Sequence, residues 1–126
     1  MYNQGASGEL KAVENSDWAS PIVVVPKSSS SVRICAHYKV SLNSQIEDHV
    51  YVLPTIEDIF SQLKGDKFSK TDLANAFLQL PIDKESQKLL TIATQQGLFQ
   101  LMTLPFGVKT APLLFQQVMD SILQGL

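Results

Sequence analysis

Residues 68–77 constrain the fold of this chain more than any other stretch, because they place a carboxylate where two kinds of backbone structure meet. Residues 68–73 can run extended, and residues 74–79 favour a helical turn. Asp72 lies near this junction, and two interpretations of it stay open. It can be a helix N-cap that accepts a hydrogen bond from a backbone N–H of the new turn, or a metal ligand held on a strand and directed into a cleft. A strand that carries Asp72 also requires a neighbouring strand.

Two apolar runs rich in β-branched residues predict a pair of strands in the first third of the chain. Residues 22–25 form the first run and residues 32–36 form the second. Residues 28–31 are four serines, which predict a hairpin loop between the strands. This loop can be a solvated, flexible tip. Because Lys27 and Arg33 flank it, the loop can also hold two cations over a phosphate.

Apolar residues at i, i+3, i+4 and i+7 predict two amphipathic helices. The first begins at Thr55, an N-cap with Asp58 three residues on, and ends before Gly65. The second has Pro112 in its first turn and Gly125 past its end. We expect both apolar stripes to pack into the core. They comprise Ile56, Ile59, Phe60 and Leu63 in the first helix and Phe115, Val118, Met119, Ile122 and Leu123 in the second.

The region between the two helices predicts a short turn and two further strands. Asp83 can cap a turn that runs through Lys88. Residues 89–93 and 98–104 predict two strands joined around residues 95–97. The expected order is strand, strand, helix, strand, short helix, strand, strand and helix. This order predicts an α+β fold with a largely antiparallel sheet.

The length of 126 residues suits one domain. We expect residues 1–16, which are polar and small, to form an exposed N-terminal arm, and residues 17–126 to form the domain. The formal net charge of −2 argues against a protein that coats nucleic acid by bulk electrostatics. The net charge leaves open the possibility that basic residues line one local surface.

The start of the chain does not resemble an export signal, because it is polar and has no apolar run behind it. Residues 22–25 are too short a run to span a bilayer. Cys35 is the only cysteine, so no internal disulfide can form, and we expect its small side chain to be buried. These observations predict an intracellular protein of the cytoplasm or nucleus that is not secreted and has no membrane partner.

Seven short motifs occur in a fixed order along the chain. They are residues 16–21 (Ser-Asp-Trp-Ala-Ser-Pro), 32–35 (Val-Arg-Ile-Cys), 51–58 (Tyr-Val-Leu-Pro-Thr-Ile-Glu-Asp), 68–73 (Phe-Ser-Lys-Thr-Asp-Leu), 104–107 (Leu-Pro-Phe-Gly), 111–112 (Ala-Pro) and 115–116 (Phe-Gln). Each motif is weak alone, but the ordered set is specific. In this order, residues 8–126 resemble the N-terminal part of the reverse transcriptase of gypsy-type long-terminal-repeat retrotransposons.

The resemblance implies that residues 17–126 form the fingers and the first part of the palm of a right-hand polymerase. Asp72 matches the first catalytic aspartate and would bind Mg²⁺, with Mn²⁺ as the alternative. Phe77 matches an aromatic ring that excludes a ribose 2′-hydroxyl. The positions that match nucleotide-binding residues are Lys27, Arg33, Leu73, Ala74, Asn75, Ala76, Phe77, Phe106 and Gly107. The implied partners are an RNA or DNA template–primer, a deoxynucleoside triphosphate and the remainder of the Pol polyprotein.

One aspartate is not sufficient for this chemistry, since primer extension is an in-line phosphoryl transfer assisted by two divalent ions. The family's other two catalytic aspartates belong to a Tyr-x-Asp-Asp turn, which we expect shortly after Leu126. The resemblance therefore predicts part of an RNA-directed DNA polymerase, truncated before that turn and inactive by itself. In the intact parent it would serve retrotransposition, which includes DNA integration.

Three departures from the family pattern keep a second hypothesis open. Residues 27–31 are Lys-Ser-Ser-Ser-Ser where the family has Lys-Lys-Asp-Gly-Ser, so one cation and the turn glycine are lost. His37 replaces an aspartate and Lys39 replaces an arginine. Phe77 can also be a plain core residue and Arg33 a solvated strand residue. The chain can therefore be a non-enzymatic relic, or a fragment that a host retained to bind nucleic acid or a partner.

Overall fold

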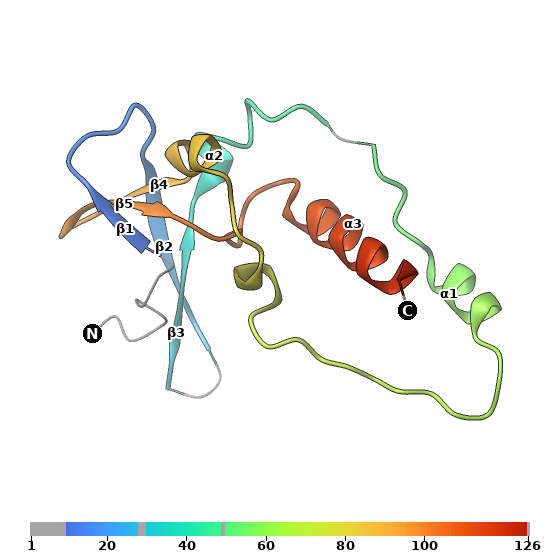
Figure 1. Cartoon of the computed structure of the whole chain (residues 1–126). Coiled ribbons are helices and arrows are strands. Elements are labelled where there is room, and N and C mark those ends of the chain that lie inside the picture. The colour runs from blue at the N-terminus through green and yellow to red at the C-terminus, as the bar shows by residue number, and fades with distance from the viewer. Residues whose placement is uncertain (1–9, 28–29, 49, 126) are drawn as a thin grey trace.

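The structure is a computed structural model, and it describes residues 10–27, 30–48 and 50–125 (Figure 1). Five strands form one sheet in the order β1-β5-β4-β2-β3. The strands are β1 (Leu10–Val13), β2 (Ser20–Pro26), β3 (Val32–Ala36), β4 (Thr91–Thr94) and β5 (Gly97–Leu101). β2 and β4 are parallel, and the other neighbours are antiparallel. The predicted α+β class with a largely antiparallel sheet is confirmed.

Both predicted hairpins are present. β2 pairs with β3 from Ile22 opposite Ala36 to Pro26 opposite Val32, and β4 pairs with β5. The backbone N–H of Lys27 donates to the carbonyl of Ser31 at 2.8 Å, which closes the first hairpin. Of the predicted loop, residues 28–29 lie outside the described residues. Cys35 in β3 is half-buried rather than buried as expected.

The expected N-terminal arm requires a correction. Residues 1–9 lie outside the described residues, but Leu10–Val13 form strand β1 rather than an exposed arm. β1 pairs with β5 from Leu10 opposite Leu101 to Val13 opposite Leu98. The physical reason is the free edge of β5, whose unpaired backbone groups accept a further strand whatever its polarity. Leu10 also packs against the core, which its polar neighbours in the sequence do not reveal.

The core lies where the sheet meets a short 3-10 helix, η1 (Tyr38–Val40), and the start of helix α3 (Ala111–Gln124). Tyr38 is fully buried there, and its hydroxyl donates to the carbonyl of Leu90 at 3.3 Å. Burial raises the pKa of Tyr38 well above its ordinary value. The buried apolar side chains are Ala36, Tyr38, Leu42, Leu90, Ile92, Leu104, Val108 and Ala111.

Helix α1 (Ile56–Gln62) forms as predicted but is not part of the core. The Thr55 hydroxyl accepts from the backbone N–H of Asp58 at 3.2 Å, and the Asp58 carboxylate accepts from the backbone N–H of Thr55 at 2.9 Å, so the capping box is confirmed. Every residue of α1 is exposed, and Phe60 is 67% exposed. Figure 1 shows α1 at the opposite end of the molecule from the sheet. The expectation that its stripe packs into the core is wrong, because periodicity predicts an apolar face but not what covers it.

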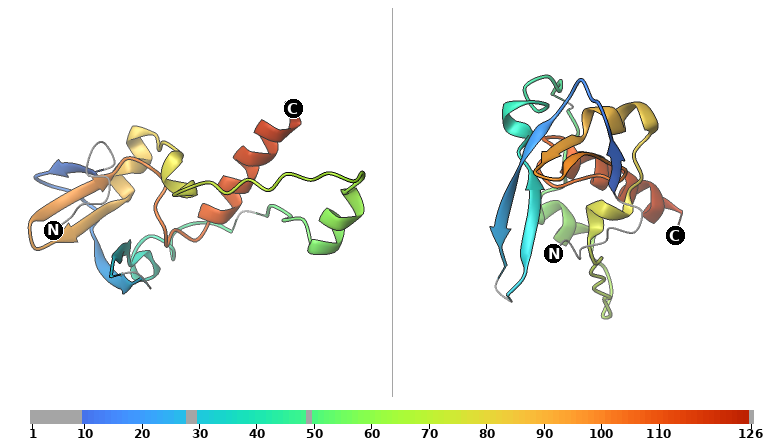
Figure 2. Two further views of the ribbon diagram at one scale, coloured as in Figure 1. Left: turned by 90° about the horizontal axis from the view of Figure 1, so that it is seen from below. Right: turned by 90° about the vertical axis from the view of Figure 1, so that its left-hand side faces the viewer.

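Helix α3 also has the predicted ends, with Pro112 in its first turn and Gly125 as its C-cap. Its apolar stripe is buried only in part. Phe115 and Met119 are half-buried, whereas Ile122 is 55% exposed, and Val118 and Leu123 are also exposed. Figure 2 shows the C-terminal half of α3 projecting away from the sheet. Among the residues that the structure describes, no helix combines the length and the apolar character needed to cross a membrane.

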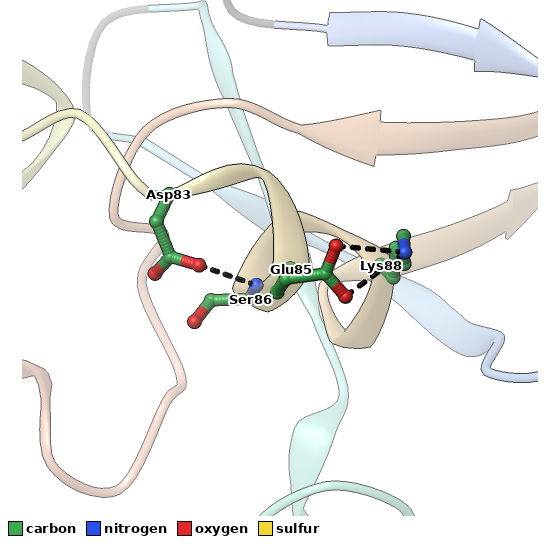
Figure 3. Close-up of polar contacts among 4 residues, drawn as sticks. All are labelled: Asp83, Glu85, Ser86 and Lys88. Carbon is green, nitrogen blue, oxygen red and sulfur yellow. Dashed lines mark hydrogen bonds and ion pairs between the residues drawn. The ribbon is translucent and has the colours of Figure 1, made fainter.

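The short helix α2 (Lys84–Leu89) confirms the cap predicted at Asp83. The Asp83 carboxylate accepts from the backbone N–H of Ser86 at 2.9 Å (Figure 3). Glu85 and Lys88 form an ion pair at 2.9 Å one turn apart. Both side chains are well exposed, so this pair stabilises the helix only slightly.

Candidate functional site

Three phenylalanine rings from distant parts of the chain meet in one cluster, and one of them, Phe77, packs against the core. Phe77 lies in the 3-10 helix η2 (Ala76–Gln79), Phe106 in the turn after β5, and Phe115 in α3. The ring centroids lie 5.3 Å apart for Phe77 and Phe106 and 5.4 Å apart for Phe77 and Phe115, both in tilted geometry. The guanidinium of Arg33 lies 5.0 Å from the centroid of the Phe106 ring. These three distances and the tilted ring geometry are typical of attractive ring–ring and cation–π contacts.

The β2–β3 hairpin carries two cations, of which Arg33 lies beside this cluster. Arg33 pairs with Val25 across the hairpin, and Lys27 follows Val25 by two residues, so alternation places Lys27 on the same face as Arg33. Both cations are exposed, and neither forms an ion pair with a carboxylate in the described part of the chain. The hairpin therefore presents positive charge that an anion can reach.

The turn that carries Phe106 is tightly constrained at Gly107. Gly107 has φ +98°, and a Cβ placed there would lie 2.8 Å from the carbonyl oxygen of Ala36. The Asn43 side chain donates to the carbonyl of Gly107 at 2.8 Å and accepts from the backbone N–H of Lys109 at 2.9 Å. Sequence reasoning missed Asn43, and no local signal could have found it, since its partners are 64 and 66 residues away.

Asp72 does not lie where the sequence predicted. Residues 63–73 form no strand: after a bend at residues 65–66 they run as an exposed segment back towards the sheet (Figure 1). The helix η2 begins only at Ala76. The strand expected over residues 68–73 is absent, because no described strand lies beside this segment to complete its hydrogen bonds. The N-cap interpretation is also wrong: Asn75, with φ 50°, occupies the cap position of η2.

Asp72 is exposed and makes no hydrogen bond or ion pair with the described residues. A carboxylate suits a hard divalent cation. In the described ranges, however, no three His, Cys, Asp or Glu side chains come together in a group that could hold a metal ion. The described residues therefore supply one candidate ligand and not a complete metal site. Leu73 and Ala74 are exposed like Asp72, and the carbonyl of Ala74 accepts from the side-chain amide of Gln79 in η2 at 2.7 Å.

A polar contact ties the segment before α1 to α3. The hydroxyl of Tyr51 donates to the carboxylate of Asp120, which also accepts from the side-chain amide of Gln116 at 2.7 Å. The hydrogen bond to Asp120 raises the pKa of Tyr51, because ionisation would remove the donor and place two negative charges together. Two of the sequence motifs, residues 51–58 and 115–116, are thus linked through Asp120.

Comparison with known proteins identifies the class of protein to which this fold and site belong. Residues 25–126 match the family model described as reverse transcriptase (RNA-dependent DNA polymerase). The chain belongs to this family.

The curated relatives are much longer proteins. The chain is 44% identical over 121 residues to the uncharacterized protein K02A2.6 of Caenorhabditis elegans, covering 94% of this chain and 10% of the relative. It is 30% identical over 122 residues to the transposon Tf2-3 polyprotein of Schizosaccharomyces pombe, covering 96% of this chain and 9% of the polyprotein. The chain thus spans about a tenth of the length of these relatives.

Solved structures agree with this assignment. A foamy viral protease–reverse transcriptase in complex with double-stranded DNA aligns over 93% of this chain and 20% of its own, with a TM-score of 0.80 and 28% identity. The native prototype foamy virus protease–reverse transcriptase aligns with a TM-score of 0.78 and 27% identity, over 93% of this chain and 16% of its own. The predicted reverse transcriptase-like fold, present as part of a larger domain, is confirmed.

Proposed function

We propose that this chain supplies the fingers and the first part of the palm of an RNA-directed DNA polymerase within a gypsy-type retrotransposon Pol polyprotein. The observation that carries the proposal is the contact cluster of Arg33, Phe106 and Phe77. The sequence motifs assign all three residues to one nucleotide site, and the fold brings them into contact from three separate elements. Family membership supports the same activity.

The cluster suits a deoxynucleoside triphosphate. Arg33 and Lys27 would neutralise its phosphates, and a guanidinium can hold a phosphate with two hydrogen bonds. The Phe77 ring, held between Phe106 and Phe115, would lie against the sugar and exclude a 2′-hydroxyl. We place residues 73–76 and Gly107 at the same nucleotide, as the motifs assign them.

Asp72 is proposed as one ligand of a divalent cation, Mg²⁺ first and Mn²⁺ as the alternative. The remaining ligands would come from elsewhere in the parent polyprotein, so the chain by itself is proposed to be inactive. The foamy viral relative solved with double-stranded DNA supports a nucleic-acid duplex as the partner of the intact domain. We further propose that the parent acts inside the cell, in the cytoplasm or the nucleus.

Arg33 provides the sharpest test of the nucleotide site. In a polyprotein segment that contains this chain and extends beyond Leu126, Arg33→Ala should raise the KM for deoxynucleotide by about tenfold or more, since a charge-assisted hydrogen bond contributes about 1.5–3 kcal/mol. Steady-state primer extension measures this effect. Lys64→Ala, which removes an exposed cation outside the cluster, should leave KM unchanged. Equal effects of the two variants would contradict the assignment.

The alternative function is a non-enzymatic fragment that binds nucleic acid or a partner. The isolation of Asp72 among the described residues favours it. A longer segment that extends no primer, yet binds a template–primer duplex in an Arg33-dependent way, would support this alternative over the polymerase.

A further inference from the structure

The side chain of Asn43 binds the turn that carries Phe106 at two points. Its amide nitrogen donates to the carbonyl of Gly107 at 2.8 Å, and its amide oxygen accepts from the backbone N–H of Lys109 at 2.9 Å. Asn43 thus binds an acceptor and a donor two residues apart on one turn. An asparagine side chain carries both functions, whereas an aspartate carboxylate carries acceptors alone.

Asn43 is itself fixed to the core. Its backbone N–H donates to the carbonyl of Tyr38 at 2.8 Å, and Tyr38 is fully buried. On the other side of the turn, the carbonyl of Ala36 leaves no room for a Cβ at Gly107. The turn is therefore held between the end of β3 and Asn43. Because both are attached to the core, the core fixes the position of the turn.

The Phe106 ring in turn positions the guanidinium of Arg33. Arg33 is exposed, and in the described part of the chain it forms no ion pair that would fix its long side chain. The guanidinium lies 5.0 Å from the centroid of the Phe106 ring. A ring held in place beneath a flexible cation restricts the orientations of that cation.

We propose that Asn43 is a positioning residue for Arg33. Through its two hydrogen bonds to the turn it holds the Phe106 ring beneath the guanidinium, so that the cation is pre-oriented for an anionic ligand. The role of this pre-orientation in triphosphate binding rests on the proposed function, but the coupling of Asn43 to Arg33 does not.

The composition of the chain makes this coupling directly measurable. Arg33 is the one arginine in the sequence, so its Nε–Hε group gives a single NMR signal that needs no assignment. In the full 126-residue chain, the ring current of Phe106 should shift this signal. A Phe106→Leu variant gives the position of the signal without the ring.

Asn43→Asp is the informative variant. It keeps the acceptor for Lys109 but directs a carboxylate oxygen at the Gly107 carbonyl, so the Arg33 signal should move to its position in Phe106→Leu. Asn43→Ala, which removes both hydrogen bonds without adding charge, should do the same. Asn15→Asp is the matched control, because Asn15 is exposed and its side chain makes no hydrogen bond in the described part of the chain. It should leave the signal at the wild-type position.

Acid distinguishes positioning from a general loss of structure. Protonation of the new carboxyl group restores a donor for the Gly107 carbonyl, so the ring-current shift of Asn43→Asp should return as the pH falls through the pKa of that group. The Asn43→Ala signal should not respond in this way. An Arg33 signal that stays at the wild-type position in both Asn43 variants, or one that acid restores equally in both, overturns the proposal.

A titration with dTTP and Mg²⁺ separates this inference from the proposed function. If dTTP shifts the Arg33 signal in the wild-type chain, and does so more weakly in Asn43→Asp than in Asn15→Asp, the positioning role extends to the nucleotide. If dTTP binds both variants equally, that role is overturned. If dTTP fails to shift the wild-type signal, the extension of the positioning role to the nucleotide is overturned for this chain, while the coupling of Asn43 to Arg33 is decided by the spectra without nucleotide.

Discussion

At the scale of single residues, the backbone and the surroundings of Gly107 both exclude a side chain. Its φ of +98° is one that L residues rarely adopt, and an added Cβ would lie 2.8 Å from the Ala36 carbonyl. The glycine of the Leu-Pro-Phe-Gly motif is therefore required by the close approach of the turn to β3. The motif nominated Gly107 as a nucleotide-binding position, whereas its contact with Ala36 is visible only in the fold.

Replacement of Gly107 by alanine should consequently destabilise the chain. The strained backbone costs about 1–3 kcal/mol, and the contact with Ala36 adds to that cost. Gly97→Ala is the matched control, since Gly97 has φ +125° but nothing within 4 Å of its added Cβ. Denaturant unfolding should give a larger loss in free energy of unfolding for Gly107→Ala. The same loss in both variants would show that the contact with Ala36 does not matter.

At the scale of elements, the caps of α1 and α2 predict how the helices respond to acid. The side chain and the backbone N–H of Thr55 lower the pKa of Asp58 below its ordinary value of 3.8. Because the folded-state pKa is the lower one, the ionised cap stabilises α1 above pH 3.8, and this contribution is lost as the pH falls through the lowered pKa.

Thr55→Ala should therefore raise the pKa of Asp58 towards 3.8 and reduce the helical content of α1. An NMR pH titration that follows the carboxyl groups of Asp58 and Asp83 measures the change. Asp83, whose pKa is lowered by Ser86 in α2, is the internal control and should titrate as in the wild type. A titration of Asp58 that is unchanged by the substitution would refute the capping box.

The elements also show which parts of the fold local sequence can predict. Caps and turns depend on neighbours, so Thr55, Asp83 and Gly125 could be assigned in advance. Pairing with a distant strand is not local, so neither strand β1 nor the unpaired state of residues 68–73 could be predicted. The same reason explains the site: motifs nominated Arg33, Phe77 and Phe106, whereas Asn43 and the packing of Phe115 against Phe77 depend on long-range contacts.

At the scale of the whole molecule, the chain consists of a packed part and an extended part. The sheet, η1 and the start of α3 enclose the core, whereas α1 and the two segments that lead to and from it lie apart from the sheet (Figures 1 and 2). Apolar side chains such as Val50, Phe60 and Phe68 are largely exposed there. Under the proposed function, further parts of the parent polyprotein would cover this exposed apolar surface.

The two parts should respond differently to truncation of apolar side chains. Leu104 is 2% exposed, so Leu104→Ala should lower the free energy of unfolding by about 2–5 kcal/mol. Phe60 is 67% exposed, so Phe60→Ala should leave it within about 0.5 kcal/mol of the wild type. Thermal unfolding followed by circular dichroism measures both. A large loss from Phe60→Ala would mean that α1 is packed in solution.

Substitution of Asp72 tests whether this chain contributes part of a reverse transcriptase active site. Primer extension with Mg²⁺ should be measured for the chain alone and for a polyprotein segment that continues beyond Leu126. We expect no extension by the chain alone. The longer segment should extend the primer, and Asp72→Asn should lower that rate by about a hundredfold or more, since a catalytic metal contributes several kcal/mol. Asp66→Asn, on the same exposed segment, should have no such effect. Extension by the longer segment that is equally insensitive to both substitutions would contradict a catalytic role for Asp72.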